Sequence, residues 1–185
     1  MKEVRLFEVR AAETRGALTL EGRAIVFDTP TTIHDPKGSY TEIIRSGALA
    51  EADLTDSRLL VGHDSSRIPL ARTPKTLQLS ISSAGLDFTA SLPDTEEGRS
   101  VYTAVQRRDL TGVSFAFVVP AGGYEYDPKT NIRTINKISK VLEISLVNFP
   151  AYPTASVEAR AAIDGFPKRE TARIKINQIK KRSVF

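Results

Sequence analysis

Short runs of alternating apolar and polar residues, separated by turn-forming residues, constrain this chain more than any other feature. "TLQLSISS" at 76–83 and "GLDFTASL" at 85–92 alternate residue by residue, which is the period of a half-buried strand. Only the turn near Ala84-Gly85 separates them, so we expect a β-hairpin.

Further strand-like runs are rich in β-branched and aromatic residues, and they lie at 3–9, 17–27, 39–44, 58–64, 112–119, 131–138 and 139–147. The clearest helix is expected at 94–110, where Asp94 or Thr95 can cap it, with acids in its first turn and arginines in its last. Shorter helices are expected after Ser46 and within 148–163, and a loop is expected before Pro128. This order predicts a mainly β fold with a few helices: an antiparallel β-barrel of about seven strands with flanking helices.

The composition narrows the class of protein. The 185 residues suit one domain, and no apolar run reaches the roughly 18 residues of a membrane span. The charged N-terminus lacks the apolar centre of a signal peptide, so we expect a cytoplasmic protein without membrane contact. The absence of cysteine excludes disulfides and thiolate chemistry, and two histidines disfavour a His-rich metal site. We expect no cofactor.

The positive charge lies in the C-terminal segment. Residues 167–185 carry seven Lys or Arg and one acid, a net charge of +6, which leaves −2 of the total +4 for residues 1–166. We therefore predict a body at 1–165 and a basic tail at 166–185. Such a tail suits an address, a docking segment or a nonspecific polyanion contact, so nucleic acid would bind only weakly and through the tail.

Three polar residues interrupt runs that otherwise look like core: His63 in "VGHD", Ser114 in "GVSFAF" and Glu143 in "VLEISLV". Strand alternation places Glu143 on one face with Val141, Ser145 and Val147, opposite Leu142, Ile144 and Leu146. A carboxylate flanked by apolar residues is costly unless it is paired. A serine such as Ser114 has a simpler explanation as a small polar residue bonded to a neighbouring carbonyl.

These residue types suit nucleophilic acyl transfer. A serine hydroxyl needs a base to take its proton, and imidazole titrates near neutral pH. A third group must hold the other imidazole N–H, and Glu143 is the candidate for it. A serine, a histidine and an acid occur together in most chains, so the set alone is a weak signal.

The motifs in combination are more specific. Gly-His-Asp at 62–64, Pro-Leu-Ala-Arg-Thr at 69–73, the serine strand at 110–119, and Glu-x-Ser-Leu-Val before Pro-Ala-Tyr-Pro at 143–153 follow one another. In this order they resemble the tailed-phage prohead proteases, capsid-maturation serine proteases similar in fold to the herpesvirus assemblins. The resemblance runs from about Arg15 to Pro153.

The resemblance implies an assemblin-like barrel with Ser114 as nucleophile, His63 as base and Glu143 as third member, where the herpesvirus relatives use a histidine. It implies a serine endopeptidase inside the assembling prohead in the host cytoplasm, which cleaves the scaffolding segment of the major capsid protein and trims itself. Dimers are one active form that the resembled families suggest. The assemblins also use an arginine-bearing segment for the oxyanion. "SLVNFPAYPTA" at 145–155 contains no arginine, so backbone N–H groups or a water would have to serve.

Several alternatives stay open at this point. Asp64 could orient His63 in place of Glu143, although adjacent residues normally point apart. Ser65 and Ser66 follow His63 too closely for easy catalytic geometry, and His34 lies in a turn-rich polar segment typical of a surface histidine. Arg72 is either an ion-pair partner or a substrate contact. The alternative functions are a catalytically silent scaffold or capsid-associated module, and a polyanion-binding protein that acts through its tail.

Overall fold

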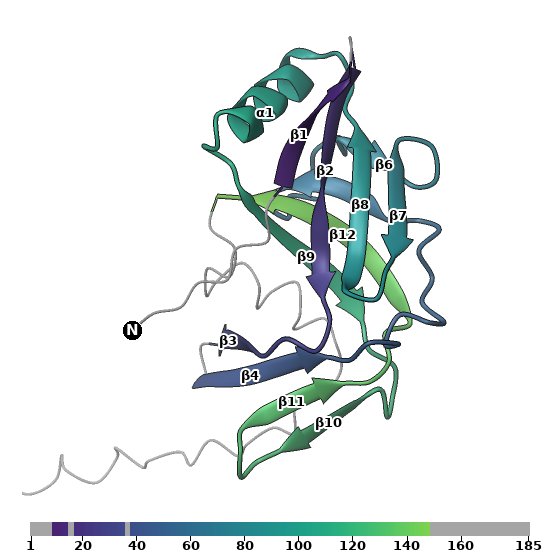
Figure 1. Cartoon of the computed structure of the whole chain (residues 1–185), viewed down its shortest axis with the longest axis vertical. Helices are drawn as coiled ribbons and strands as arrows, with labels where there is room; N and C mark the ends of the chain where they lie inside the picture. Colours follow the sequence, from purple (N-terminus) through teal and green to yellow (C-terminus); the bar gives the residue numbers. More distant parts are fainter. Residues whose placement is uncertain (1–8, 15–16, 36–37, 149–185) are drawn as a thin grey trace, which may run out of the picture.

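The computed structural model describes residues 9–14, 17–35 and 38–148 of the chain. Over these residues it contains twelve strands in three four-stranded sheets and one α-helix (Figure 1), which confirms the mainly β prediction. The elements in chain order are β1 (Val9–Thr14), β2 (Ala17–Val26), β3 (Thr31–Asp35), β4 (Gly38–Ile44), β5 (Arg58–Val61), β6 (Ala71–Arg72), β7 (Leu77–Ile81), β8 (Gly85–Ser91), α1 (Glu96–Gln106), β9 (Gly112–Val118), β10 (Tyr124–Asp127), β11 (Ile132–Ile135) and β12 (Lys140–Val147).

The first sheet has the order β1-β2-β8-β7 and is antiparallel throughout. β7 and β8 form the predicted hairpin, paired from Leu77–Ala90 to Ile81–Leu86. On β8 the buried Leu86, Phe88 and Ala90 alternate with more exposed polar residues, as the sequence pattern predicted.

The second sheet has the order β10-β11-β4-β3, with a parallel pairing between β11 and β4. The loop expected before Pro128 is wrong, because Tyr124–Asp127 form β10, which pairs antiparallel with β11. The segment Thr31–Asp35, which reads as turn-rich in the sequence, forms β3 against β4. Both β3 and β10 end the sheet, and their largely polar residues suit an edge with one solvated side.

The third sheet has the order β6-β5-β12-β9 and carries the candidate site. Its central strand, β12, runs parallel to β5 and antiparallel to β9. The pairing brings residues 58–61, 112–118 and 140–147 side by side, although they are far apart in the sequence.

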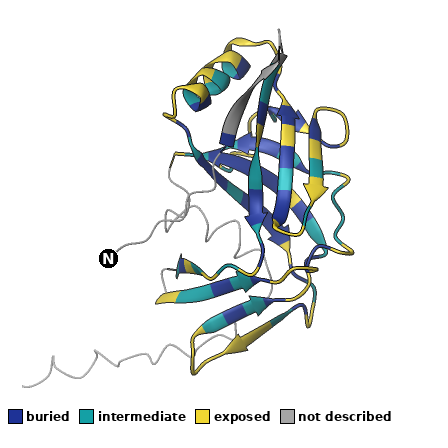
Figure 2. Cartoon of the chain, in the orientation of Figure 1, coloured by how far each residue is buried: buried dark blue, intermediate teal, exposed yellow. Residues whose placement is uncertain are grey.

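A closed barrel of seven strands is not confirmed. Each sheet of the described residues has two end strands, and no ladder of hydrogen bonds continues from one sheet into the next. The sheets share one hydrophobic core instead, which contains residues from all three sheets and α1. The buried residues are dark blue in Figure 2. Each sheet contributes fully buried side chains to this core, for example Leu20, Ile135 and Phe117. Burying a side chain of this size stabilises the fold by about 1.5–3 kcal/mol.

Helix α1 is shorter than the predicted 94–110. Thr95 is its N-cap and accepts a hydrogen bond from the Gly98 N–H at 3.2 Å, and Glu96 and Glu97 fill the first turn. The helix ends at Gln106 and Arg107 caps it, so the arginines follow the last helical turn. The helix contacts β1 and β2.

The short helix expected after Ser46 is wrong. The chain there forms successive turns, with hydrogen bonds from the Ala48, Ala50 and Ala52 N–H groups to carbonyls three residues earlier. Gly47 has φ of 91°, which is incompatible with a right-handed helix and explains the interruption.

Other expectations fall on residues outside the described part. They are most of the strand at 3–9, the helix within 148–163, and the basic tail. Among the described residues, no helix is both long enough and apolar enough to cross a membrane.

Candidate active site

The third sheet brings the predicted site residues together. In the β12–β9 ladder, Ser145 lies opposite Ser114 and Glu143 lies opposite Ala116. Residues directly opposite in an antiparallel pair project to the same face, with Cβ atoms about 4.5–5.5 Å apart. Ser114, Ser145 and Glu143 therefore share one face of the sheet. The other face carries Phe115 and Phe117, whose stacked rings lie 5.1 Å apart in the core.

A β-bulge in β12 corrects the predicted faces. The register shifts between Val141 and Glu143, so Leu142 is the extra residue and is 39% exposed. Val141 pairs with Phe117 and is fully buried, which places it on the core face with Ile144 and not on the face of Glu143 as predicted. The extra residue switches the alternation and turns Glu143 toward the site.

The backbone after β5 directs His63 toward β12, the strand that carries Glu143. The ladder extends one residue past β5, where the Gly62 N–H donates to the Leu146 carbonyl at 2.9 Å. Gly62 and His63 then both adopt left-handed conformations, with φ of 63° and 61°. This conformation is uncommon for a residue other than glycine, and such positions cluster at functional sites.

His63 and Glu143 form a buried pair. The imidazole Nδ1 lies 2.5 Å from Glu143 Oε1, and each side chain is only 11% exposed. A carboxylate can only accept, so Nδ1 is the ring nitrogen that donates in this contact, and a neutral imidazole in this orientation has its lone pair on Nε2. The contact supplies the partner that a buried carboxylate requires.

Ser145 completes the network and was not assigned a role from the sequence. Its hydroxyl donates to Glu143 Oε2, and it accepts the backbone N–H of His63 at 3.1 Å. The side chain is completely buried. Its placement on the face of Glu143, two residues along the strand, is the signal in the sequence that could have identified it.

Ser114 is half-buried on β9, next to this network. Within the described residues no hydrogen bond reaches its hydroxyl, so the simple explanation of a serine bonded to a neighbouring carbonyl does not hold there. The structure contains no hydrogen bond between Ser114 and His63 either. Catalytic hydrogen bonds are often long before substrate binds.

The rival residues point elsewhere. The Asp64 carboxylate accepts the Ser66 N–H at 3.0 Å and the Ser66 hydroxyl at 2.6 Å, and these bonds lower its pKa. Ser65 is exposed in the same turn. His34 Nδ1 lies 2.8 Å from Ser39 Oγ in the β3–β4 hairpin, outside the third sheet.

Arg72 forms an ion pair. Its Nε lies 2.8 Å from Asp56 Oδ1, and this bond is the main reason why the pKa of Asp56 is lowered. The Arg72 side chain remains 58% exposed, and the predicted substrate contact at Arg72 stays a prediction.

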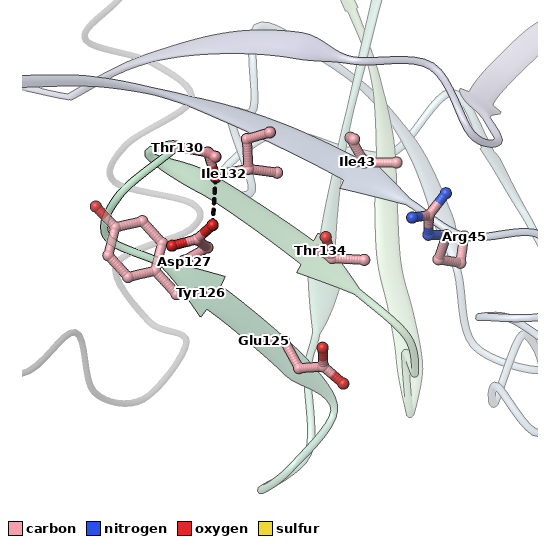
Figure 3. Close-up of a pocket in the computed structure, with 8 residues that line it drawn as sticks. All are labelled: Ile43, Arg45, Glu125, Tyr126, Asp127, Thr130, Ile132 and Thr134. Atoms are coloured by element: carbon pink, nitrogen blue, oxygen red, sulfur yellow. Dashed lines mark hydrogen bonds between the residues drawn. The ribbon is translucent and has the colours of Figure 1, made fainter.

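A pocket lies over the second sheet and contains none of the predicted site residues (Figure 3). Asp127, one of its three charged lining residues, accepts the Lys129 N–H and the Thr130 hydroxyl, both at 2.8 Å, which identifies a turn-stabilising carboxylate with a lowered pKa. The lining residues are Ile43, Arg45, Glu125, Tyr126, Asp127, Thr130, Ile132 and Thr134. Among the described residues, no group of three or more histidine or acidic side chains gathers that could hold a metal ion.

A buried histidine–carboxylate pair beside a strand serine, carried on a mainly β fold, is the kind of site that serine hydrolases with a histidine base use. Residues 5–169 match the family model of the caudovirus prohead serine protease, and the chain belongs to this family. The predicted family is thereby confirmed. No curated protein and no solved structure matches the chain, so the likeness to the herpesvirus assemblins stays a prediction.

Proposed function

We propose that this chain is a serine endopeptidase of procapsid maturation, with Ser114 as nucleophile, His63 as general base and Glu143 as the residue that orients the base. The main support is the 2.5 Å contact between His63 Nδ1 and Glu143 Oε1. Glu143 lies on β12, which pairs with β9, the strand of Ser114. Membership of a prohead serine protease family supports the reaction class.

In the proposed reaction, Ser114 Oγ attacks the scissile carbonyl while His63 Nε2 takes the hydroxyl proton. The Glu143 carboxylate stabilises the imidazolium that forms. The imidazolium then protonates the leaving amine, and an acyl-enzyme remains on Ser114. Water, deprotonated by His63, releases the acid and regenerates the hydroxyl. All three residues belong to one chain, so the proposed chemistry does not require a second copy.

Membership of a prohead protease family supports activity within the prohead. We propose the scaffolding segment of the major capsid protein and the chain's own C-terminal segment as substrates. The family match ends at residue 169, which leaves most of the basic segment outside it. This segment suits docking to an acidic scaffold surface in the assembling shell within the host cell.

A fluorophosphonate probe tests the proposal directly. Purified protein should take up one phosphonate, and mass spectrometry of its peptides should locate the adduct on Ser114, because only a serine activated by a base reacts readily. An adduct on another serine would reassign the nucleophile. A folded protein without any adduct would favour a catalytically silent capsid-associated module.

The identity of the acid can be tested by two isosteric changes. Glu143→Gln should lower kcat by about 10-fold or more, because a neutral amide stabilises the imidazolium less well. The matched control is Asp64→Asn, next to His63 in the sequence, which should leave kcat within about twofold because its carboxylate bonds only to Ser66 among the described residues. Peptide cleavage measured at saturating substrate distinguishes the two. A larger loss for Asp64→Asn would show that Asp64 is the orienting acid.

A further inference from the structure

We propose that Ser145 is a positioning residue that holds the His63–Glu143 pair in its working geometry. The proposal rests on the proposed function of that pair and adds a fourth residue to it. Ser145 touches neither the scissile bond nor the nucleophile's proton in the proposed reaction, so its effect would act through its neighbours.

One hydroxyl joins both members of the pair. Ser145 donates its only proton to Glu143 Oε2 and accepts the His63 backbone N–H at 3.1 Å. Glu143 Oε1 lies 2.5 Å from His63 Nδ1, and this contact closes a ring of three hydrogen bonds. The ring joins Glu143 and Ser145, both on β12, to His63. The last torsion of a glutamate is broad, so a bond to the second oxygen is what restricts the rotation of the carboxylate.

The same bond restrains His63. Its left-handed backbone, with φ of 61°, persists only where its surroundings hold it. The Ser145 oxygen receives the N–H of this residue and so fixes the start of the side chain, while Glu143 fixes its end. Ser145 is completely buried and its proton is already donated, which makes it unsuitable as a nucleophile in its own right.

The chain contains a matched comparison. Ser57, the residue before β5, is as completely buried as Ser145. Its hydroxyl donates to the carbonyl of Val141 on β12 at 2.8 Å. This bond joins two backbone segments and does not include the His63–Glu143 pair. Ser57→Ala therefore removes a buried hydroxyl bonded to β12, as Ser145→Ala does, without touching the proposed catalytic network.

The first experiment monitors the hydrogen bond between His63 and Glu143 in protein that cannot catalyse cleavage. In full-length protein with Ser114→Ala, which prevents self-cleavage, proton NMR should show the His63 Nδ1–H far downfield of the amides. Adding Ser57→Ala should leave this resonance in place. Adding Ser145→Ala should move it upfield or broaden it by exchange with solvent. An unchanged resonance in the Ser145→Ala protein would overturn the proposal, whether or not the chain proves to be a protease.

The second experiment measures peptide cleavage with Ser114 intact. Ser145→Ala should lower kcat by about 10- to 100-fold, the effect of one hydrogen bond to a charged group, and leave KM within about twofold. Ser57→Ala should keep kcat within about twofold. Equal losses for both variants would reduce Ser145 to a structural role and refute the proposal. If Ser145→Ala does not fold, Ser145→Cys is read in the same way, since it is nearly isosteric and donates only weakly.

The two proposals fail differently. A wild-type protein that takes no fluorophosphonate, combined with a resonance that depends on Ser145, would refute the protease assignment and keep the positioning role. Labelling of Ser114 at an equal rate in wild type and Ser145→Ala would support the nucleophile and overturn the role of Ser145.

Discussion

Replacing Ser114 with alanine is expected to lower proteolysis by roughly 10⁴-fold or more, because it removes the proposed nucleophile. The fold should survive with a loss of less than about 1 kcal/mol, since no hydrogen bond within the described residues reaches this half-buried hydroxyl. Cleavage of the capsid-protein scaffolding segment, followed by gel electrophoresis, measures the activity. Thermal unfolding measures the stability.

Self-cleavage provides a second measurement on the same variant. Stored wild-type protein should shorten by a discrete C-terminal piece, and the Ser114→Ala protein should stay at full length by mass spectrometry. A folded Ser114→Ala protein that still cleaves the scaffolding segment at the wild-type rate would rule out Ser114 as the nucleophile.

Replacing His63 with alanine should reduce proteolysis about as much as Ser114→Ala, because a nucleophile and its base act as one unit. Unlike Ser114→Ala, it should also lower the free energy of unfolding by about 1–3 kcal/mol, since the buried Glu143 carboxylate loses a hydrogen bond. Urea unfolding and peptide cleavage measure the two effects on one preparation.

The second histidine of the chain is the matched control. His34 bonds Ser39 in the β3–β4 hairpin, so His34→Ala should leave cleavage within about twofold of wild type. An active His63→Ala protein, or an inactive His34→Ala protein that remains folded, would contradict the assignment of the base.

The local predictions held where a segment's own pattern decides its structure. The β7–β8 hairpin formed because both strands alternate strongly and only a short turn separates them. Helix α1 begins at a capping threonine, Thr95, that the sequence had offered beside Asp94. The prediction after Ser46 failed because Gly47 takes a left-handed conformation in a series of turns. The short polar strand β10 was missed because its pairing with β11, and not its own composition, makes it a strand.

The sequence by itself determined the residue types of the site, the strands that carry Ser114 and Glu143, and the family to which the chain belongs. These depend on local alternation and on the order of the motifs, and both can be read from the sequence without knowing which strands pair. Only the tertiary structure decided that His63 contacts Glu143 and not Asp64, that Leu142 forms a bulge, and that Ser145 bonds both members of the pair. The parallel pairing of β5 with β12 brings together residues about 80 positions apart, as in the His63–Glu143 contact. No local pattern encodes such a register, because it follows from how the three sheets bury one common core.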